Sequence, residues 1–318
     1  MNRSIMAVGP HCDDVEFQFG ATLLKYHREY GYRVIYVEST NNMSGTWREK
    51  NGFPPLPEGN YKRRTCEISP GLLDHTVPWF IEMPQRKREA DEAARRYFDT
   101  DVISLDYPQS AYIDGNLNQI VSNYGADCPC CTSSGKPTIL TACKDDTEIT
   151  RVRDLILREN PEVIFCINVV DQNPEHSCTA ILILKAFMEA RKKGYAGSLL
   201  YPAPLNPTGF GLMTDCWDTF VDTTGYEEEK RRAIGIHACQ IPNPARLDLM
   251  DKLHGELSGC GEAEAYRIAT LSDDCTGELT RELRKNNAYC RTHFQEMFFS
   301  EKSERLFSDF WDRISGNY

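Results

Sequence analysis

The chain contains 318 residues, with 47 acidic and 36 basic side chains, which give a formal net charge of −11. This acidity argues against a nucleic acid or an anionic membrane as a partner, because both are bound through basic patches. No apolar run approaches the length of a membrane span, and the first residues lack the apolar core and cleavage site of a secretory signal. We therefore expect a cytoplasmic protein whose 13 cysteines are reduced thiols.

The predicted elements begin with a strand at residues 4–8, a helix at residues 17–30 and a second strand at residues 33–37. The short joints between them imply a right-handed crossover between parallel strands. Further helices are predicted at residues 85–98, 148–159, 179–192 and 227–237, and further strands at residues 101–105, 163–167 and 198–201. This order predicts an α/β fold, Rossmann-like, with a mostly parallel sheet that is covered by helices on both faces.

Residues 1–270 are predicted to form this body, with insertions near residues 47–83 and 107–149. The first insertion is irregular and rich in proline, as binding loops and lids often are. Residues 271–318 are predicted to be a helical C-terminal extension, because apolar residues recur there at three- and four-residue spacing. These helices should dock either on the body or on a second copy of the chain, so a homo-oligomer is one expectation.

The second insertion holds Cys128, Cys130 and Cys131, with Cys143 near its end. Two residues separate Cys128 from Cys131, which is the spacing of a metal-binding hairpin. A structural zinc site normally needs a second well-spaced pair, and the sequence offers none. Reduced thiols are therefore the favoured interpretation of this cluster.

Three polar side chains, His11, Asp13 and Asp14, follow the first predicted strand, and His176 follows the apolar strand at residues 163–167. In an open α/β sheet, the loops after parallel strands meet at one edge, where ligands bind. Two histidines and one carboxylate with an open coordination position suit a catalytic Zn²⁺ or Fe²⁺. His11, Asp14 and His176 are therefore the predicted metal ligands, and Asp13 is the predicted general base.

Each of these residues also has a simpler interpretation. A carboxylate at a helix start is often a cap, and a single histidine there is more often a cap or a surface group than a ligand. The occurrence of both motifs, each after a predicted strand, favours the metal site. A dinucleotide site is disfavoured, because the turn after the first strand has no glycine-rich phosphate loop.

Several short motifs follow one another along the chain, each occurring once. They are His11-Cys12-Asp13-Asp14-Val15-Glu16 with Gly20, then Ser44-Gly45-Thr46, Arg86 with Glu89, Ala93 and Ala94, Tyr107-Pro108-Gln109-Ser110, Asn173-Pro174-Glu175-His176, Lys230 with His237 and Gln240, and Ala263-Glu264-Ala265-Tyr266. Over residues 4–268 this series resembles the LmbE/PIG-L family of metal-dependent N-acetylglucosamine-type deacetylases.

The resemblance implies the same three metal ligands and the same base, with zinc as the cofactor. It further implies that Arg86 faces the hydroxyls of a sugar, and that Gln109 and Ser44 lie at substrate-binding positions. The reaction implied is hydrolysis of the acetamide of an N-acetylated amino sugar or glycoconjugate, with release of acetate. Such a reaction needs a polarised carbonyl, a hydroxide and a donor to the oxyanion.

Three positions depart from the family pattern. Cys12 replaces a proline beside a predicted ligand, where the change should be tolerated. Asn173 replaces a histidine that in the family stabilises the oxyanion or protonates the leaving amine; asparagine can donate a hydrogen bond but cannot carry a proton. His237 is the candidate catalytic substitute, although support or helix packing is its simpler role. Gln109 replaces a sugar-contacting aspartate, which indicates a different pattern of substrate hydroxyls.

These departures leave two alternatives beside an N-deacetylase. The first is a metal-dependent amidase that acts on a non-acetyl amide conjugate, which Gln109 and the long insertion at residues 47–83 favour. The second is a carbohydrate-binding relative that has lost turnover, which Asn173 alone favours.

Overall fold

Seven strands form a mixed sheet at the centre of the structure, a computed structural model that describes residues 3–43, 79–113, 119–121, 135–171, 173–203, 217–238 and 245–315. The strands are β1 (Ser4–Gly9), β2 (Arg33–Thr40), β3 (Val102–Tyr107), β6 (Val163–Cys166), β7 (Ser198–Pro202), β8 (Thr219–Asp222) and β9 (Ala263–Thr270). They lie in the order β3-β2-β1-β6-β7-β9-β8. A separate antiparallel pair is formed by β4 (Ala111–Ile113) and β5 (Gln119–Val121).

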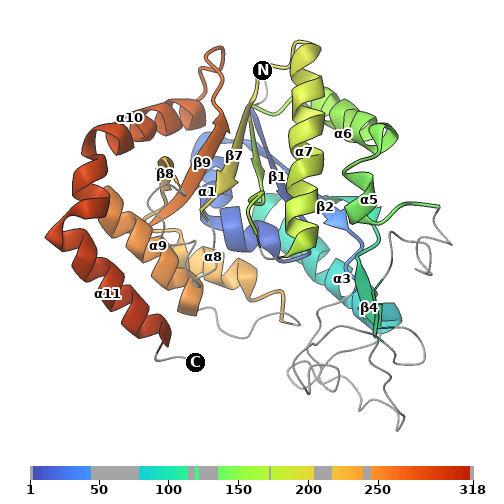
Figure 1. Cartoon of the computed structure of the whole chain (residues 1–318), viewed down its shortest axis with the longest axis horizontal. Coiled ribbons are helices and arrows are strands. Elements are labelled where there is room, and N and C mark those ends of the chain that lie inside the picture. Colours follow the sequence, from blue (N-terminus) through green and yellow to red (C-terminus); the bar gives the residue numbers. More distant parts are fainter. Residues whose placement is uncertain are drawn as a thin grey trace, which may run out of the picture.

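Helices surround this sheet (Figure 1). They are α1 (Asp14–Tyr30), α3 (Trp79–Phe98), α5 (Ile139–Ala142), α6 (Asp146–Glu159), α7 (Pro174–Lys192), α8 (Glu227–Ile234), α9 (Ala245–Ser258), α10 (Glu278–Phe299) and α11 (Glu301–Ser315). Across the ranges that the structure describes, no helix is long and apolar enough to cross a membrane.

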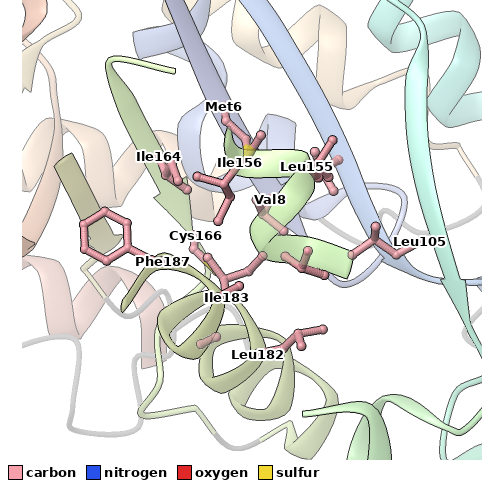
Figure 2. Packing of buried hydrophobic residues seen from close by; sticks show 14 of the residues in the cluster. Met6, Val8, Leu105, Leu155, Ile156, Ile164, Cys166, Leu182, Ile183 and Phe187 are labelled. Carbon is pink, nitrogen blue, oxygen red and sulfur yellow. The ribbon is translucent and has the colours of Figure 1, made fainter. Parts of the chain in front are cut away.

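The central strand β1 is buried on both faces, and its side chains alternate between two cores. Met6 and Val8 pack with α5, α6 and α7 on one face, and Figure 2 shows them with labelled residues of α6 and α7. Ile5 and Ala7 pack on the other face with residues of α1, α3, α8 and α10. The period of two along a strand explains this division. The predicted α/β fold with helices on both faces is confirmed.

The order of the strands reverses direction between β1 and β6. All neighbours from β3 to β7 are parallel, and β1 lies between β2 and β6. From β1 the chain moves to β2 and β3 on one side, and later to β6 and β7 on the other. The loops that leave β1 and β6 therefore diverge to opposite sides, which makes this the topological switch point where α/β sheets bind ligands.

The antiparallel end of the sheet was not predicted. Strand β9 runs antiparallel to both β7 and β8, and β8 forms the edge. The sequence predicts no strand at residues 219–222, and it indicates residues 263–266 only as part of the motif series. Four residues in an edge strand carry too little pattern for a prediction, because their pairing depends on β9, which is distant in sequence.

The helix α10 of the predicted C-terminal extension docks on this edge strand. Asn286 Nδ2 donates to the Phe220 carbonyl at 2.9 Å, and Asn287 Nδ2 donates to the Asp218 carbonyl at 2.8 Å. These amides satisfy carbonyl groups that an edge strand otherwise exposes. The extension thus covers the open edge of the sheet of its own chain.

Helix α3 begins earlier than predicted. It starts at Trp79, six residues before the expected start at residue 85, and it contains Pro84. The prediction began after this proline because proline lacks an N–H donor and usually interrupts a helix. The end of the expected insertion at residues 47–83 is thus helical, and residues 44–78 lie outside the described residues.

The cysteine cluster of the second insertion is described only at Cys143. This residue is a buried free thiol whose Sγ donates to the Leu140 carbonyl at 3.4 Å. Cys128, Cys130 and Cys131 lie outside the described residues, so the interpretation of the cluster stays a prediction.

Candidate metal centre

The turn between β1 and α1 folds two predicted ligands against each other. The backbone N–H of His11 donates to Asp14 Oδ2 at 2.8 Å, so this carboxylate bends back over the turn. Gly9 permits the turn, because a Cβ there would lie only 2.8 Å from the Cβ of Asp14. Asp13 occupies the N-cap position of α1, yet its side chain makes no capping hydrogen bond. A helix cap therefore does not explain the half-buried Asp13.

Three side chains, from this turn and from α7, converge at the switch point. His11 Nδ1 lies 3.2 Å from Asp14 Oδ2, and His176 Nε2 lies 3.2 Å from His11 Nδ1 and 3.6 Å from Asp14 Oδ1. A tetrahedral zinc ion with bonds of about 2.1 Å holds its ligand atoms about 3.4 Å apart. The three side chains therefore place ligand atoms at separations close to those of such a zinc site. Among the described residues, this is the group of histidine, cysteine and acidic side chains that could hold a metal ion.

The electrostatics of this group favour a positive charge at its centre. Burial by itself lowers the pKa of His11, but the Asp14 and Glu175 carboxylates outweigh it and raise that pKa to about 10. Burial raises the pKa of Asp14, and His176 and His11 more than reverse the effect and bring it to about 2. A divalent cation would meet the same demand for positive charge and would displace the proton from the imidazole.

Each histidine is held by a second carboxylate on its other ring nitrogen. His11 Nε2 lies 2.7 Å from Glu175 Oε2, which leaves Nδ1 toward the centre. His176 Nδ1 lies 3.0 Å from Asp171 Oδ2, which leaves Nε2 toward the centre. Carboxylates in this position fix the tautomer and the orientation of metal-binding imidazoles. Sequence reasoning missed both, although Glu175 stands directly before His176 and Asp171 lies five residues before it.

The residues predicted to contact the substrate are buried where the structure describes them. Arg86 is 2% exposed, with Nε 3.3 Å from Cys12 Sγ. Gln109 is also 2% exposed, and its Nε2 donates to Glu175 Oε2 at 2.8 Å. Ser44 lies outside the described residues. Arg86 and Gln109 therefore lie against the two metal-binding motifs.

The two further catalytic candidates occupy different surroundings. Asn173 is the N-cap of α7, where its Oδ1 accepts the backbone N–H of Glu175 at 2.9 Å. His237 is fully buried, and its Nε2 lies 3.0 Å from Glu16 Oε2. The Tyr36 hydroxyl lies 3.0 Å from the same oxygen of Glu16. Asn173 is thus adjacent to the ligands, whereas His237 lies in the polar interior beneath the first motif.

The residues that follow β2 support the first motif from the side, a contact that sequence reasoning did not identify. Asn42 Oδ1 accepts the backbone N–H of Cys12 at 2.8 Å, and Asn42 Nδ2 donates to Glu38 at 3.1 Å. Asn42 adopts a left-handed backbone with φ of 60°, which asparagine tolerates better than most residues. Burial raises the pKa of Glu38 to about 8. The polar residues that follow β2 are the feature of the sequence from which this contact could have been predicted.

The model of the PIG-L family, described as GlcNAc-PI de-N-acetylase, matches residues 6–187. This stretch is more than half of the chain and contains both motifs of the candidate metal site. The chain belongs to the PIG-L family. The resemblance inferred from the motifs is therefore confirmed. A comparison with curated proteins found no match.

Several solved structures share the PIG-L fold of this chain. The N,N'-diacetylchitobiose deacetylase of Pyrococcus horikoshii is 19% identical, with a TM-score of 0.52 over 84% of this chain and 83% of that one. GalB, the 4-carboxy-2-hydroxymuconate hydratase of Pseudomonas putida KT2440, is 18% identical, with a TM-score of 0.57 over 87% and 99%. A deacetylase of the teicoplanin biosynthesis pathway is 14% identical, with a TM-score of 0.52 over 86% and 100%.

At these identities the likeness shows a shared fold. Because that fold carries deacetylases and a hydratase, activity has to be argued from the site. The PIG-L match ends within α7, so His237 and the helices from α8 onward lie beyond the matched stretch.

Proposed function

We propose that this PIG-L protein is a zinc-dependent hydrolase that removes the acetyl group from an N-acetylated amino sugar or sugar conjugate. The observation that carries the proposal is the convergence of His11 Nδ1, Asp14 and His176 Nε2. The neighbouring Asp13 is the N-cap of α1, but its side chain makes no capping hydrogen bond. The family description, a de-N-acetylase, supports the reaction class. In this proposal the three converging residues hold the ion.

A zinc ion bound by these residues supplies Lewis-acid polarisation of the amide carbonyl and of a water molecule. Asp13 then accepts one proton from the attacking water at its carboxylate, while the water oxygen bonds to the carbonyl carbon. The carbon–nitrogen bond breaks, and the amine nitrogen must gain a proton. Asp13 delivers the proton that it accepted, because Asn173 cannot carry one. The products are acetate and the free amino sugar.

Asn173 remains suited to a neutral role in this reaction. Its Oδ1 is used by the helix cap, whereas the two N–H donors of its amide are chemically able to stabilise a developing oxyanion. His237 is proposed as a buried support of Glu16 and of the first motif, because it is fully buried. This division assigns proton transfer to Asp13 alone.

The test combines metal analysis with acetate release from N-acetylglucosamine derivatives. The parent protein should bind about one zinc and release acetate, and Asp13→Ala should lose about 10²–10⁴-fold in kcat while it keeps the metal. A metal-loaded Asp13→Ala variant as active as the parent contradicts the mechanism. Tight glycan binding without turnover in the parent, with hydrolysis gained by Asn173→His, would instead support the carbohydrate-binding alternative.

A second candidate function is hydrolysis of a non-acetyl amide conjugate. The buried position of Gln109 favours it, because a side chain that is 2% exposed and directed at Glu175 offers little to a sugar hydroxyl. A series of acyl groups on one amine separates the two candidates. A preference for acetyl supports the first, and a preference for a larger acyl group supports the second.

A further inference from the structure

Glu175 is a buried carboxylate whose two oxygens each accept two hydrogen bonds. Its Oε2 accepts from His11 Nε2 at 2.7 Å and from Gln109 Nε2 at 2.8 Å. Its Oε1 accepts from the Ser110 backbone N–H at 2.7 Å and from Ser110 Oγ at 3.0 Å. Because an ionised carboxylate has about four lone-pair positions, these donors fill it completely. Glu175 therefore has one orientation relative to the His11 ring.

The orientation of Glu175 determines which nitrogen of His11 faces the cluster. A carboxylate on Nε2 keeps a proton there, so that Nδ1 faces Asp14 and His176 and is the nitrogen that a bound metal would take. Gln109 and Ser110 follow β3, whereas Glu175 lies in the first turn of α7. The residues after β3 thus reach His11 through a side chain of another element.

The chemistry of the contact requires a donor at position 109. An aspartate or glutamate there would bring a second carboxylate against Glu175 in a buried site, where two like charges repel strongly. The glutamine amide instead supplies an N–H and carries no charge. The amide at this position is therefore matched to Glu175.

We propose that Gln109 and Ser110 are positioning residues that act through Glu175 to hold His11 in its metal-binding tautomer and orientation. The proposal rests on the proposed function only in that the cluster binds a metal. It gives Gln109 a role different from direct contact with the substrate. It also implies that substrate specificity is determined by other side chains.

The experiment measures the affinity for Zn²⁺ alone, by competition with a chromophoric chelator and without substrate. Gln109→Glu preserves size and replaces the donor with a charge, so Zn²⁺ affinity should fall about 10–100-fold. Gln109→Met and Ser110→Ala each remove one donor without adding charge, and each should lower Zn²⁺ affinity by more than about twofold but less than about tenfold. The absorption spectrum of the Co²⁺ form should also change in Gln109→Glu, because the His11 ring reorients.

Asn286→Asp is the matched control, because Asn286 is a buried amide that donates to a carbonyl on the far edge of the sheet. It should lower thermal stability and leave Zn²⁺ affinity within about twofold of the parent. If Gln109→Glu does not fold, Gln109→Met carries the test through a loss of Zn²⁺ affinity that Asn286→Asp does not show.

Two results would overturn the inference. One is parent-like Zn²⁺ affinity in both Gln109 variants. The other is a rise in KM at saturating metal with no change in metal affinity, which would indicate direct substrate contact. A protein that shows the expected affinity pattern but hydrolyses no amide would refute the proposed function and leave this inference intact.

Discussion

Two buried ionic clusters differ in where their positive charge comes from. In the metal-site cluster (His11, Asp14, Glu175 and His176), His11, Asp14 and His176 direct a ring nitrogen or a carboxylate oxygen at a common centre, and Glu175 holds the outer ring nitrogen of His11. In the lysine cluster (Lys230, Asp251 and Glu264), the ammonium group itself lies at the centre, with Nζ 2.7 Å from each carboxylate. Apart from the partly exposed His176, both clusters are buried, and both surround a position that is suited to a cation.

The two clusters consequently have opposite effects on the pKa of a histidine. Burial would lower the pKa of His11, but the surrounding carboxylates raise it to about 10. Burial and the charge of Lys230 both lower the pKa of His254 to about 3. A buried carboxylate needs a cation because desolvation is expensive. The chain supplies that cation permanently at Lys230, whereas the proposed metal site would take its cation from solution.

Removing the ammonium group of Lys230 should have the largest effect on the stability of the protein. Lys230→Met leaves Asp251 and Glu264 buried without their partner, so the free energy of unfolding should fall by about 3–5 kcal/mol. Urea unfolding of the metal-free protein measures the change. Lys192→Met, at a side chain that is 67% exposed, is the control and should change stability by less than about 0.5 kcal/mol. A loss below about 1 kcal/mol in Lys230→Met would contradict the comparison.

Removing the proposed zinc ion should have a smaller effect on stability, and its size should depend on the zinc concentration. A ligand that binds only the folded state, at 100 times its Kd, adds about 2.7 kcal/mol to the free energy of unfolding. Addition of a chelator should therefore lower the midpoint of thermal unfolding of the zinc-loaded protein. Asp14→Ala should show no such shift, whereas Lys230→Met should show the parent shift because the two clusters are separate. An equal chelator shift in Asp14→Ala would place the metal elsewhere.

The titration of His254 should have the smallest of the three effects on stability. Its folded pKa of about 3 lies below the unfolded value of 6.5, so the unfolded state binds more protons between these values and stability falls as pH decreases. The titration of this histidine should make the free energy of unfolding about 1.4 kcal/mol lower at pH 5.5 than at pH 7.5. Urea unfolding of the parent and of His254→Phe at both pH values isolates this contribution. Identical pH dependence in the two proteins would refute it.

Local patterns in the sequence were sufficient for the parallel half of the molecule. The apolar runs of β1 and β6 and the helical spacing of α1 predict strands and helices within a few residues, because burial imposes their periods directly. The ligand set also follows from the sequence as an expectation. His11 and Asp14 lie in one turn, His176 follows another apolar strand, and parallel topology brings such turns to one edge.

Tertiary structure alone decided the remaining contacts, because they join residues that are distant in sequence. Nothing in the pattern near Gln109 indicates that its amide meets Glu175, and nothing near Lys230 indicates Glu264. The antiparallel end of β9 and β8 depends in the same way on α10, whose amides satisfy the edge strand. A sequence therefore indicates which side chains can bind a cation, whereas the packing of distant elements determines how those side chains are oriented.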